Sequence, residues 1–205
     1  MKAIKDFSQL DLNGHYSYAD YLTWKFEQAI ELIRGKVFKM AAPSTRHQVI
    51  SRELTLALGN HFKHHKCQLF AAPFDVRLFD KLKSLKTDKN VYTVIQPDLC
   101  IICDLQKLDT KGCLGAPDLM VEILFPGNSK REMKIKKDLY AESGVREYWI
   151  VDPTSETVSK FNVEGESVFG RPYIFVSDEL MPSTIFPDFI LNLNELFPNQ
   201  ERIEE

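Results

Sequence analysis

The chain has 205 residues, of which 44% are hydrophobic and 27% charged, the usual balance of a soluble globular domain. Its formal net charge of -3 excludes a protein that is basic overall, so any surface that binds nucleic acid must be local. No apolar run approaches the roughly 18 residues that a membrane span needs.

The first third of the chain predicts a short helix, a strand pair and a long helix. Ser17, with Asp20 three residues later, forms an approximate capping box and indicates the start of a short helix. Residues 29–41 alternate in polarity around an Arg-Gly step, which indicates two paired strands or one kinked strand. Apolar residues at roughly helical spacing then predict a long helix over residues 45–65.

The middle of the chain predicts three strands. Residues 67–79 and 91–104 indicate one strand each, and Pro97 marks a bend or an edge position in the second. A connector over residues 105–116 follows. Residues 117–125 are apolar on both faces, as expected for a central strand that helices cover on both sides.

The last third predicts a helix over residues 128–144 that a glycine ends, and a buried strand over residues 145–152. Residues 157–170 indicate a hairpin, and residues 186–197 a short strand with a terminal helical turn. In this order the elements predict a mixed α/β domain with one central sheet. We expect residues 1–205 to form a single domain, since no stretch marks a boundary.

The cysteines bear on the cellular compartment. Four cysteines are too few for a disulfide framework in a chain of this size, and the N-terminus has no apolar stretch long enough for a signal peptide. We therefore expect a cytoplasmic protein with reduced thiols. Cys100 and Cys103 have C-x-x-C spacing, but residues three apart on a strand point to opposite faces, so we expect buried side chains rather than a metal site.

Two carboxylates interrupt apolar strands. Glu122 lies in the centre of the predicted central strand, and Asp98 stands just before the apolar run LCII. An ionised carboxylate is costly to bury without a partner. In one interpretation the two converge on a divalent cation such as Mg²⁺, which binds one or two protein carboxylates together with phosphate and water. In the other, Asp98 caps a turn after Pro97, and Glu122 pairs with a buried lysine or arginine.

Three further side chains each allow a functional and an ordinary interpretation. Glu31 is either a site residue or a solvated strand end. His47, at the opening of the long helix, is either a site residue or a helix-start residue bonded to backbone or water. The helix after Glu122 is rich in lysine. Lys136, which shares a face with Tyr140, either leans toward the carboxylates or belongs to a solvated cationic face.

Three segments carry a resemblance to a known family: QPDLCIICD at residues 96–104, GCLGAPDLMVEIL at 112–124 and KDLYAESGVREYWIVDP at 137–153. They resemble the Uma-type family of restriction endonucleases, within the PD-(D/E)XK nuclease superfamily. The resemblance runs from about Tyr18 to Leu196. It implies a restriction-endonuclease-like fold, with a mixed central sheet flanked by helices, and a phosphodiesterase site that depends on Mg²⁺ or Mn²⁺.

The resemblance also implies roles for individual side chains. Asp98 and Glu122 match the two acidic residues of the family motif and would bind the metal. Glu31 and His47 match the upstream stretches E-L-I-x-G and P-S-x-x-H, and would belong to the same catalytic site.

The superfamily's usual lysine would lie two residues after the glutamate, where this chain has Leu124. In related sequences a lysine in the next helix appears instead, within a Lys-x-x-x-Tyr pattern that Lys136 and Tyr140 match. The resemblance therefore implies that Lys136 is the catalytic cation.

We expect the protein to hydrolyse DNA phosphodiester bonds as a homodimer, since two sites cut a duplex more easily than one and twofold assemblies are common. Lys63, Lys66 and the lysines of residues 81–89 are candidates for phosphate contacts. One alternative is a catalytically inactive module that binds nucleic acid or protein. Another is a hydrolase for RNA or a different phosphodiester.

Overall fold

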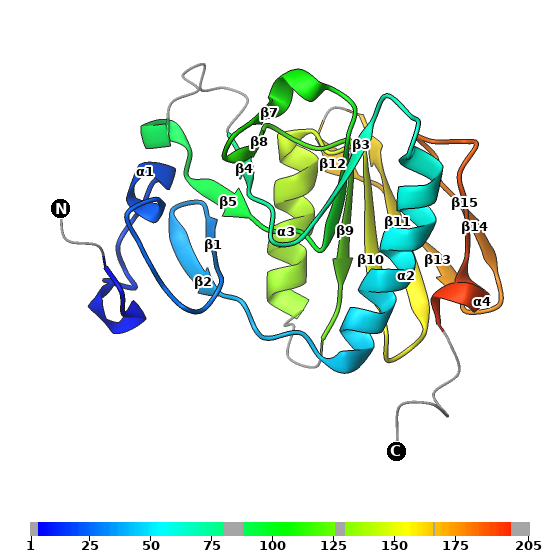
Figure 1. Ribbon diagram of the computed structural model, residues 1–205, viewed down its shortest axis with the longest axis horizontal. Coiled ribbons are helices and arrows are strands. Elements are labelled where there is room, and N and C mark those ends of the chain that lie inside the picture. Colours follow the sequence, from blue (N-terminus) through cyan, green and yellow to red (C-terminus); the bar gives the residue numbers. More distant parts are fainter. Residues whose placement is uncertain (1–3, 80–87, 126–129, 166, 198–205) are drawn as a thin grey trace. The chain divides into compact units, whose positions relative to one another are not determined.

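The computed structural model describes residues 4–79, 88–125, 130–165 and 167–197 (Figure 1). They form two compact units, each made of stretches that are separated in the sequence. The units are Met1–Ala42 with Pro73–Gln96 and Gln106–Ala116, and Pro43–Ala72 with Pro97–Leu105 and Pro117–Glu205. Each unit has its own principal sheet. The mixed α/β class is confirmed, and the strands divide between two larger sheets where one was expected.

The first unit contains a mixed sheet of six strands among its described residues. The strands are β1 (Ile30–Ile33), β2 (Lys36–Lys39), β4 (Val76–Leu78), β5 (Thr93–Ile95), β7 (Leu108–Asp109) and β8 (Gly112–Leu114). They pair in the order β2-β1-β5-β4-β8-β7. Arg34 and Gly35 turn the chain between β1 and β2 with φ values of 49° and 78°, in the left-handed region that glycine tolerates best. The predicted strand pair is thus confirmed.

The short helix α1 (Tyr18–Tyr21) also belongs to the first unit and begins as predicted. The Ser17 side chain accepts a hydrogen bond from the Asp20 N–H, and the Asp20 carboxylate accepts one from the Ser17 N–H. This reciprocal pair satisfies two donors that a helix start leaves without an intrahelical partner. The 3-10 helices of the described chain are η1 (Phe7–Gln9), η2 (Asp88–Asn90) and η3 (Leu105–Lys107).

The second unit contains a larger mixed sheet. Its strands are β3 (Gln68–Ala71), β6 (Leu99–Ile102), β9 (Leu119–Ile123), β10 (Glu147–Asp152), β11 (Thr157–Glu164), β12 (Val168–Phe169) and β13 (Tyr173–Val176). They pair in the order β12-β11-β10-β9-β6-β3, with β13 also beside β11. β9 runs parallel to β10 and antiparallel to β6, so it is an interior strand, as predicted. The predicted β11–β12 hairpin is confirmed as well.

Among its described residues, the second unit also contains three helices and a small hairpin. They are α2 (Thr45–Phe62), α3 (Lys130–Ser143), α4 (Leu193–Leu196) and the antiparallel pair β14 (Leu180–Pro182) and β15 (Ile190–Asn192). Gly144 follows α3 with a φ of 97° and ends the helix as predicted. The predicted short strand and terminal helical turn correspond to β15 and α4. β13 and β14 were not predicted. Among the described helices, none combines the length and apolar character that crossing a bilayer requires.

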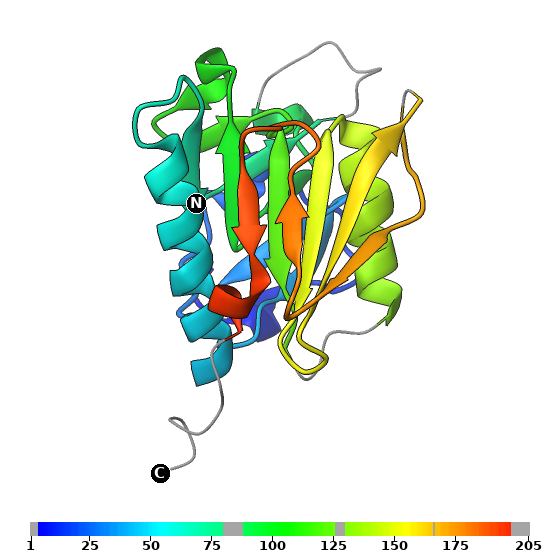
Figure 2. The same cartoon turned by 90° about the vertical axis from the view of Figure 1, so that its right-hand side faces the viewer.

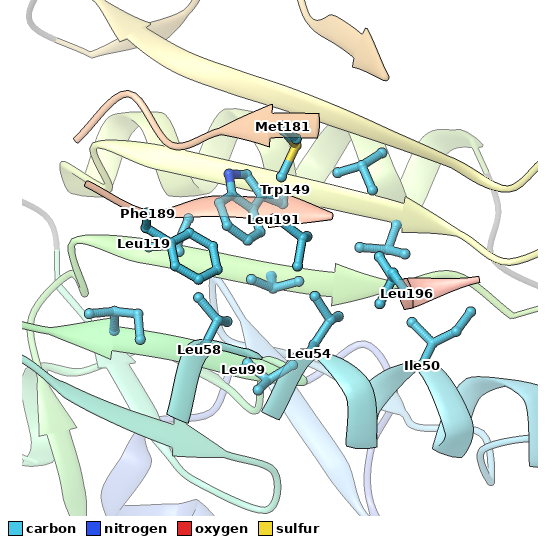
Figure 3. Packing of buried hydrophobic residues seen from close by; sticks show 14 of the residues in the cluster. Ile50, Leu54, Leu58, Leu99, Leu119, Trp149, Met181, Phe189, Leu191 and Leu196 are labelled. Carbon is cyan, nitrogen blue, oxygen red and sulfur yellow. The ribbon is translucent and has the colours of Figure 1, made fainter. Parts of the chain in front are cut away.

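The main core lies on one face of the second unit's sheet (Figure 3). Ile50, Leu54 and Leu58 recur along α2 and point toward the strands. They pack with Leu99 of β6 and Trp149 of β10, and the same cluster takes in the β14–β15 hairpin, which lies across the sheet (Figure 2). Burial of this apolar stripe is what stabilises α2, since propensity alone holds few helices of this length in water.

Two of the predicted strands are each divided between the units. Residues 67–79 form β3 in the second unit and β4 in the first, and residues 91–104 form β5 in the first and β6 in the second. The prediction of one strand in each stretch is therefore wrong. Pro73 and Pro97 stand at the divisions, where proline has no N–H to continue a ladder. The predicted connector over residues 105–116 also contains β7 and β8.

Cys67 and Cys103 form a disulfide, so the expectation of reduced thiols is wrong for this pair. The register of β3 and β6 explains the contact, because Gln68 pairs with Ile102 and the next residues outward are the two cysteines. They are 36 residues apart in the chain, a separation at which sequence spacing carries no sign of contact. Cys100 lies outside this disulfide and is buried, as expected from its place in an apolar strand.

Candidate functional site

Asp98 and Glu122 lie opposite each other at the ends of neighbouring strands of the second unit. Leu99 pairs with Val121 in the antiparallel β6–β9 ladder, and continuing this register by one residue brings Asp98 opposite Glu122. Residues directly opposite in an antiparallel pair share a face, with Cβ atoms about 4.5–5.5 Å apart. The N–H of Ile123 donates to Asp98 Oδ2 at 2.7 Å and holds the aspartate against β9. Both carboxylates therefore point to one side of the sheet.

This side is opposite to the main core. Leu119, Val121 and Ile123 belong to the core cluster that α2 covers, whereas Glu122 alternates with them along β9. Because successive strand residues point to opposite faces, Glu122 avoids the apolar layer. The alternation of faces therefore explains how an apolar strand can contain a carboxylate. The Glu122 side chain keeps 12% of its surface exposed and the Asp98 side chain 18%.

His47 approaches Asp98 from the first turn of α2. The helix begins at its N-cap Ser44, whose side chain accepts the His47 N–H at 3.2 Å. The ring Nε2 lies 3.2 Å from Asp98 Oδ1. Burial is the largest influence and lowers the pKa of His47. The hydrogen bond to Asp98 and the charges of Asp98 and Glu122 act in the opposite direction, and the resulting pKa lies above its usual value.

Lys136 and Tyr140 approach Glu122 from α3. Four residues apart on the helix, they share a face, as their spacing predicts. Lys136 Nζ donates to Glu122 Oε1 at 3.0 Å, and the Tyr140 hydroxyl donates to the same oxygen at 2.5 Å. Lys136 is buried, so it does not belong to a solvated cationic face. The buried pairing of Glu122 with a lysine, which the sequence left open as an ordinary interpretation, is present in the structure.

The other described cations of α3 have different neighbours. Lys134 is exposed and pairs with Asp138 one turn later, at 2.9 Å. Lys137 Nζ lies 5.2 Å from the ring centre of Phe161. Among the lysines of α3 whose side chains are described, Lys136 is the one that contacts Glu122.

Glu31 belongs to the first unit and is buried in β1. Its Oε1 accepts the N–H of Gln96 at 3.1 Å. The interpretation as a solvated strand end is therefore wrong. Its membership of the catalytic site stays a prediction.

Asp75 is a further acidic residue of the first unit that was not predicted from the sequence. Its carboxylate accepts hydrogen bonds from the hydroxyls of Tyr18 and Tyr21 and, at 2.8 Å, from the side chain of Gln96. Burial, followed by the charge of Asp75, raises the pKa of both tyrosines. The available signal was the same as for Asp98, a lone aspartate beside an apolar strand. Gln96 thus binds two carboxylates, through its backbone to Glu31 and its side chain to Asp75.

The candidate phosphate contacts are only partly described. Lys63 and Lys66 are exposed beyond the end of α2. Lys81, Lys83 and Lys86 lie outside the described residues, as do residues 126–129.

The donor set at the acidic pair fits a hard divalent cation. Across the described ranges, no group of three or more His, Cys, Asp or Glu side chains is arranged to hold a metal. Mg²⁺ does not require such a group, because it commonly takes one or two protein carboxylates and fills its remaining positions with water and phosphate oxygens. Asp98 and Glu122, on one side of neighbouring strands and partly exposed, match that requirement.

Comparisons with known proteins indicate the family and the fold of the chain. Residues 18–194 match the family model Uma2, described as "Putative restriction endonuclease". A similar solved structure is that of "a putative nuclease belonging to DUF820" from Anabaena variabilis, with 20% sequence identity and a TM-score of 0.69. The alignment covers 89% of this chain and 97% of that one, and it shows a shared nuclease-like fold. The comparison with curated proteins found no match.

Proposed function

Because the chain belongs to the Uma2 family, described as putative restriction endonucleases, we propose that it hydrolyses phosphodiester bonds of DNA with the help of Mg²⁺ or Mn²⁺. The observation that carries the proposal is the pair Asp98 and Glu122, opposite each other on one side of β6 and β9. A buried side chain from a different helix meets each carboxylate, His47 from α2 and Lys136 from α3. This convergence of side chains from β9, from the helices α2 and α3 and from the residue that precedes β6 is typical of a catalytic centre.

In the proposed reaction, Asp98 and Glu122 hold the cation. When bound, the ion lowers the pKa of a water molecule and neutralises charge on the phosphodiester. Asp98 is held for this task by the backbone of Ile123 at 2.7 Å, so its carboxylate does not have to be reoriented at each turnover.

Lys136 orients the attacking water and stabilises the negative charge that develops on the phosphate. Leu124, at the superfamily's usual lysine position, has neither a charge nor a donor and cannot act in this way. The ammonium of Lys136 lies 3.0 Å from Glu122, so α3 supplies a cation that β9 lacks. Lysine suits this role because its long side chain presents three donors at its end.

His47 contacts the phosphate or its surrounding water in the proposed site. Its raised pKa favours the charged form, which attracts a phosphate oxygen. Glu31 is a further proposed member of the site, on the basis of its match to the family's E-L-I-x-G stretch. Exposed lysines, among them Lys63 and Lys66, are proposed to contact the DNA backbone without reading its sequence.

A catalytically inactive binding module is the second candidate function, and a specific observation favours it. Both carboxylates already have protein partners, His47 at Asp98 and the Lys136 ammonium at Glu122, so neither depends on a metal for a partner. In combination with Leu124, this arrangement would also suit a protein that kept the fold and lost the reaction.

Cleavage assays on single-stranded, duplex and branched DNA, and on RNA, separate these functions. We expect cleavage of DNA that requires Mg²⁺ or Mn²⁺, stops with EDTA and is lost in Asp98→Asn and Glu122→Gln. Asp138→Asn is a matched control, because Asp138 lies on α3 but pairs with Lys134. Preferential cleavage of RNA would contradict the DNA substrate and show that the protein is a ribonuclease. Binding of DNA without cleavage under any of these metals would favour the inactive module.

We also propose a single nuclease domain and a cytoplasmic homodimer. The family match over residues 18–194 includes stretches of both compact units, which supports one domain. Two sites related by a twofold axis suit a cut across both strands of a duplex. Light scattering at roughly tens of micromolar tests the dimer; a monomer at that concentration counts against it, because stable dimers usually bury well over about 1,000 Å².

A further inference from the structure

Tyr140 matches the tyrosine of the Lys-x-x-x-Tyr pattern, but the proposed reaction gives it no role. Its hydroxyl donates to Glu122 Oε1, the same oxygen that accepts the Lys136 ammonium. The side chain is completely buried. A tyrosine hydroxyl usually has a hydrogen-bond partner when it is buried, and here that partner is one of the two carboxylates of the candidate site.

Both ends of Tyr140 are fixed by the fold. Its carbonyl accepts the N–H groups of Gly144 and Val145, at 3.2 and 3.0 Å, where α3 ends. Its ring meets the ring of Tyr148 on β10 nearly at a right angle, with centroids 5.0 Å apart. Edge-to-face packing of this kind favours one ring orientation. The hydroxyl is therefore directed at Glu122 by packing before any ligand binds.

The chemistry of the two donors differs. Lysine brings a positive charge, which repels a divalent cation, whereas the tyrosine hydroxyl is neutral and only orients the carboxylate. A glutamate has three side-chain torsions, so an oriented donor removes much of its freedom. Partners that orient a metal ligand typically contribute about 10–100-fold to metal affinity.

We propose that Tyr140 is a positioning residue that holds the Glu122 carboxylate ready for a divalent cation. This inference rests on the proposed function, because it assumes that Glu122 is a metal ligand. Two side chains on one face of α3 thus have different tasks. Tyr140 sets the affinity for the metal, and Lys136 orients the attacking water and stabilises the developing charge.

Calorimetric titration of the full chain with Mn²⁺, without DNA, tests the inference. We expect Tyr140→Phe to bind Mn²⁺ about tenfold more weakly than the parent while its melting temperature stays within a few degrees. Tyr148→Phe is the matched control, because it removes a hydroxyl from the equally buried ring beside Tyr140, and it should keep the parent affinity within about twofold. Lys136→Met should bind Mn²⁺ at least as tightly as the parent.

The outcomes distinguish this inference from the proposed function. If the parent binds Mn²⁺ and Tyr140→Phe binds it equally well, the positioning role is overturned and the metal site stands. If Tyr140→Phe and Tyr148→Phe lose affinity equally, with a matching fall in melting temperature, Tyr140 is only a packing residue and the inference is overturned. If the parent itself does not bind Mn²⁺, both the inference and the metal-dependent function are overturned.

Discussion

Replacing Lys136 with methionine tests the proposed catalytic role of its ammonium group. Methionine keeps an unbranched apolar side chain and removes only the ammonium, so the packing of α3 should change little. Tyr140 still donates to Glu122, which leaves the carboxylate with a partner. We therefore expect a folded protein that binds metal and DNA but cleaves at least about a hundredfold more slowly.

The magnitude follows from the geometry of Lys136. Its Nζ lies 3.0 Å from Glu122 Oε1, and two unit charges at that separation interact by roughly 5–6 kcal/mol at an effective dielectric of about 20. Loss of one preorganised charge-stabilising donor costs about 10²–10³-fold in rate. The lower end applies here, because the Lys136 side chain is 10% exposed and water can enter in its place.

The assay is single-turnover cleavage of a labelled DNA at saturating Mg²⁺, with melting temperature as a check on folding. Lys134→Met is the control, since Lys134 is an exposed lysine of the same helix that pairs with Asp138 instead. Equal rates for Lys136→Met and the parent would refute the role of the α3 lysine. Equal slowing by both lysine variants would show a general loss of positive charge instead of a local effect.

Three further predictions concern stability. Leu54→Ala, which truncates a fully buried side chain of the main core, should lower the unfolding free energy by about 2–5 kcal/mol in a guanidinium titration; a loss below about 1 kcal/mol would contradict the packing. Replacing Cys67 and Cys103 with serine should destabilise the oxidised protein by up to about 3–4 kcal/mol, the chain-entropy value for a loop of this length, and the difference from the parent should disappear in reductant. The hydrogen bond from Arg77 holds the pKa of Asp109 below its usual value. The ionised carboxylate therefore stabilises the folded protein at pH values above the usual aspartate pKa, and this stabilisation is lost as the pH falls through the lowered pKa. Asp109→Asn should therefore be less stable than the parent at neutral pH and converge with it in acid, and a difference that does not change with pH would contradict this linkage.

Local patterns sufficed for much of the secondary structure. Ser17 and Asp20 predicted where α1 begins, because capping depends only on neighbouring backbone donors. The apolar spacing of α2 and the glycine after α3 were similarly informative. The same kind of evidence failed at Pro73 and Pro97, since β-pairing partners are chosen over long distances and the apolar runs on either side gave no sign that they belong to different sheets.

The acidic residues show where local evidence ends. Glu122 and Glu147 both lie in mainly apolar strands, and residue type alone does not show which of the two carboxylates is used within the fold. Glu147 is completely buried, and its carboxylate accepts hydrogen bonds from the Trp149 indole and from the N–H groups of Thr184 and Ile185, so its binding capacity is used within the fold. Glu122 is partly exposed.

The candidate site itself depends on long-range pairing. Asp98 and Glu122 stood out by residue type, because a carboxylate beside an apolar strand is costly unless it has a partner. His47 and Lys136 were nominated by the family resemblance, since their residue types alone allowed an ordinary interpretation. Which partner each one has is decided by the β6–β9 register and by the helices α2 and α3 that bring His47 and Lys136 to the carboxylates. Such contacts join segments many residues apart, and only the packing of the folded chain specifies them.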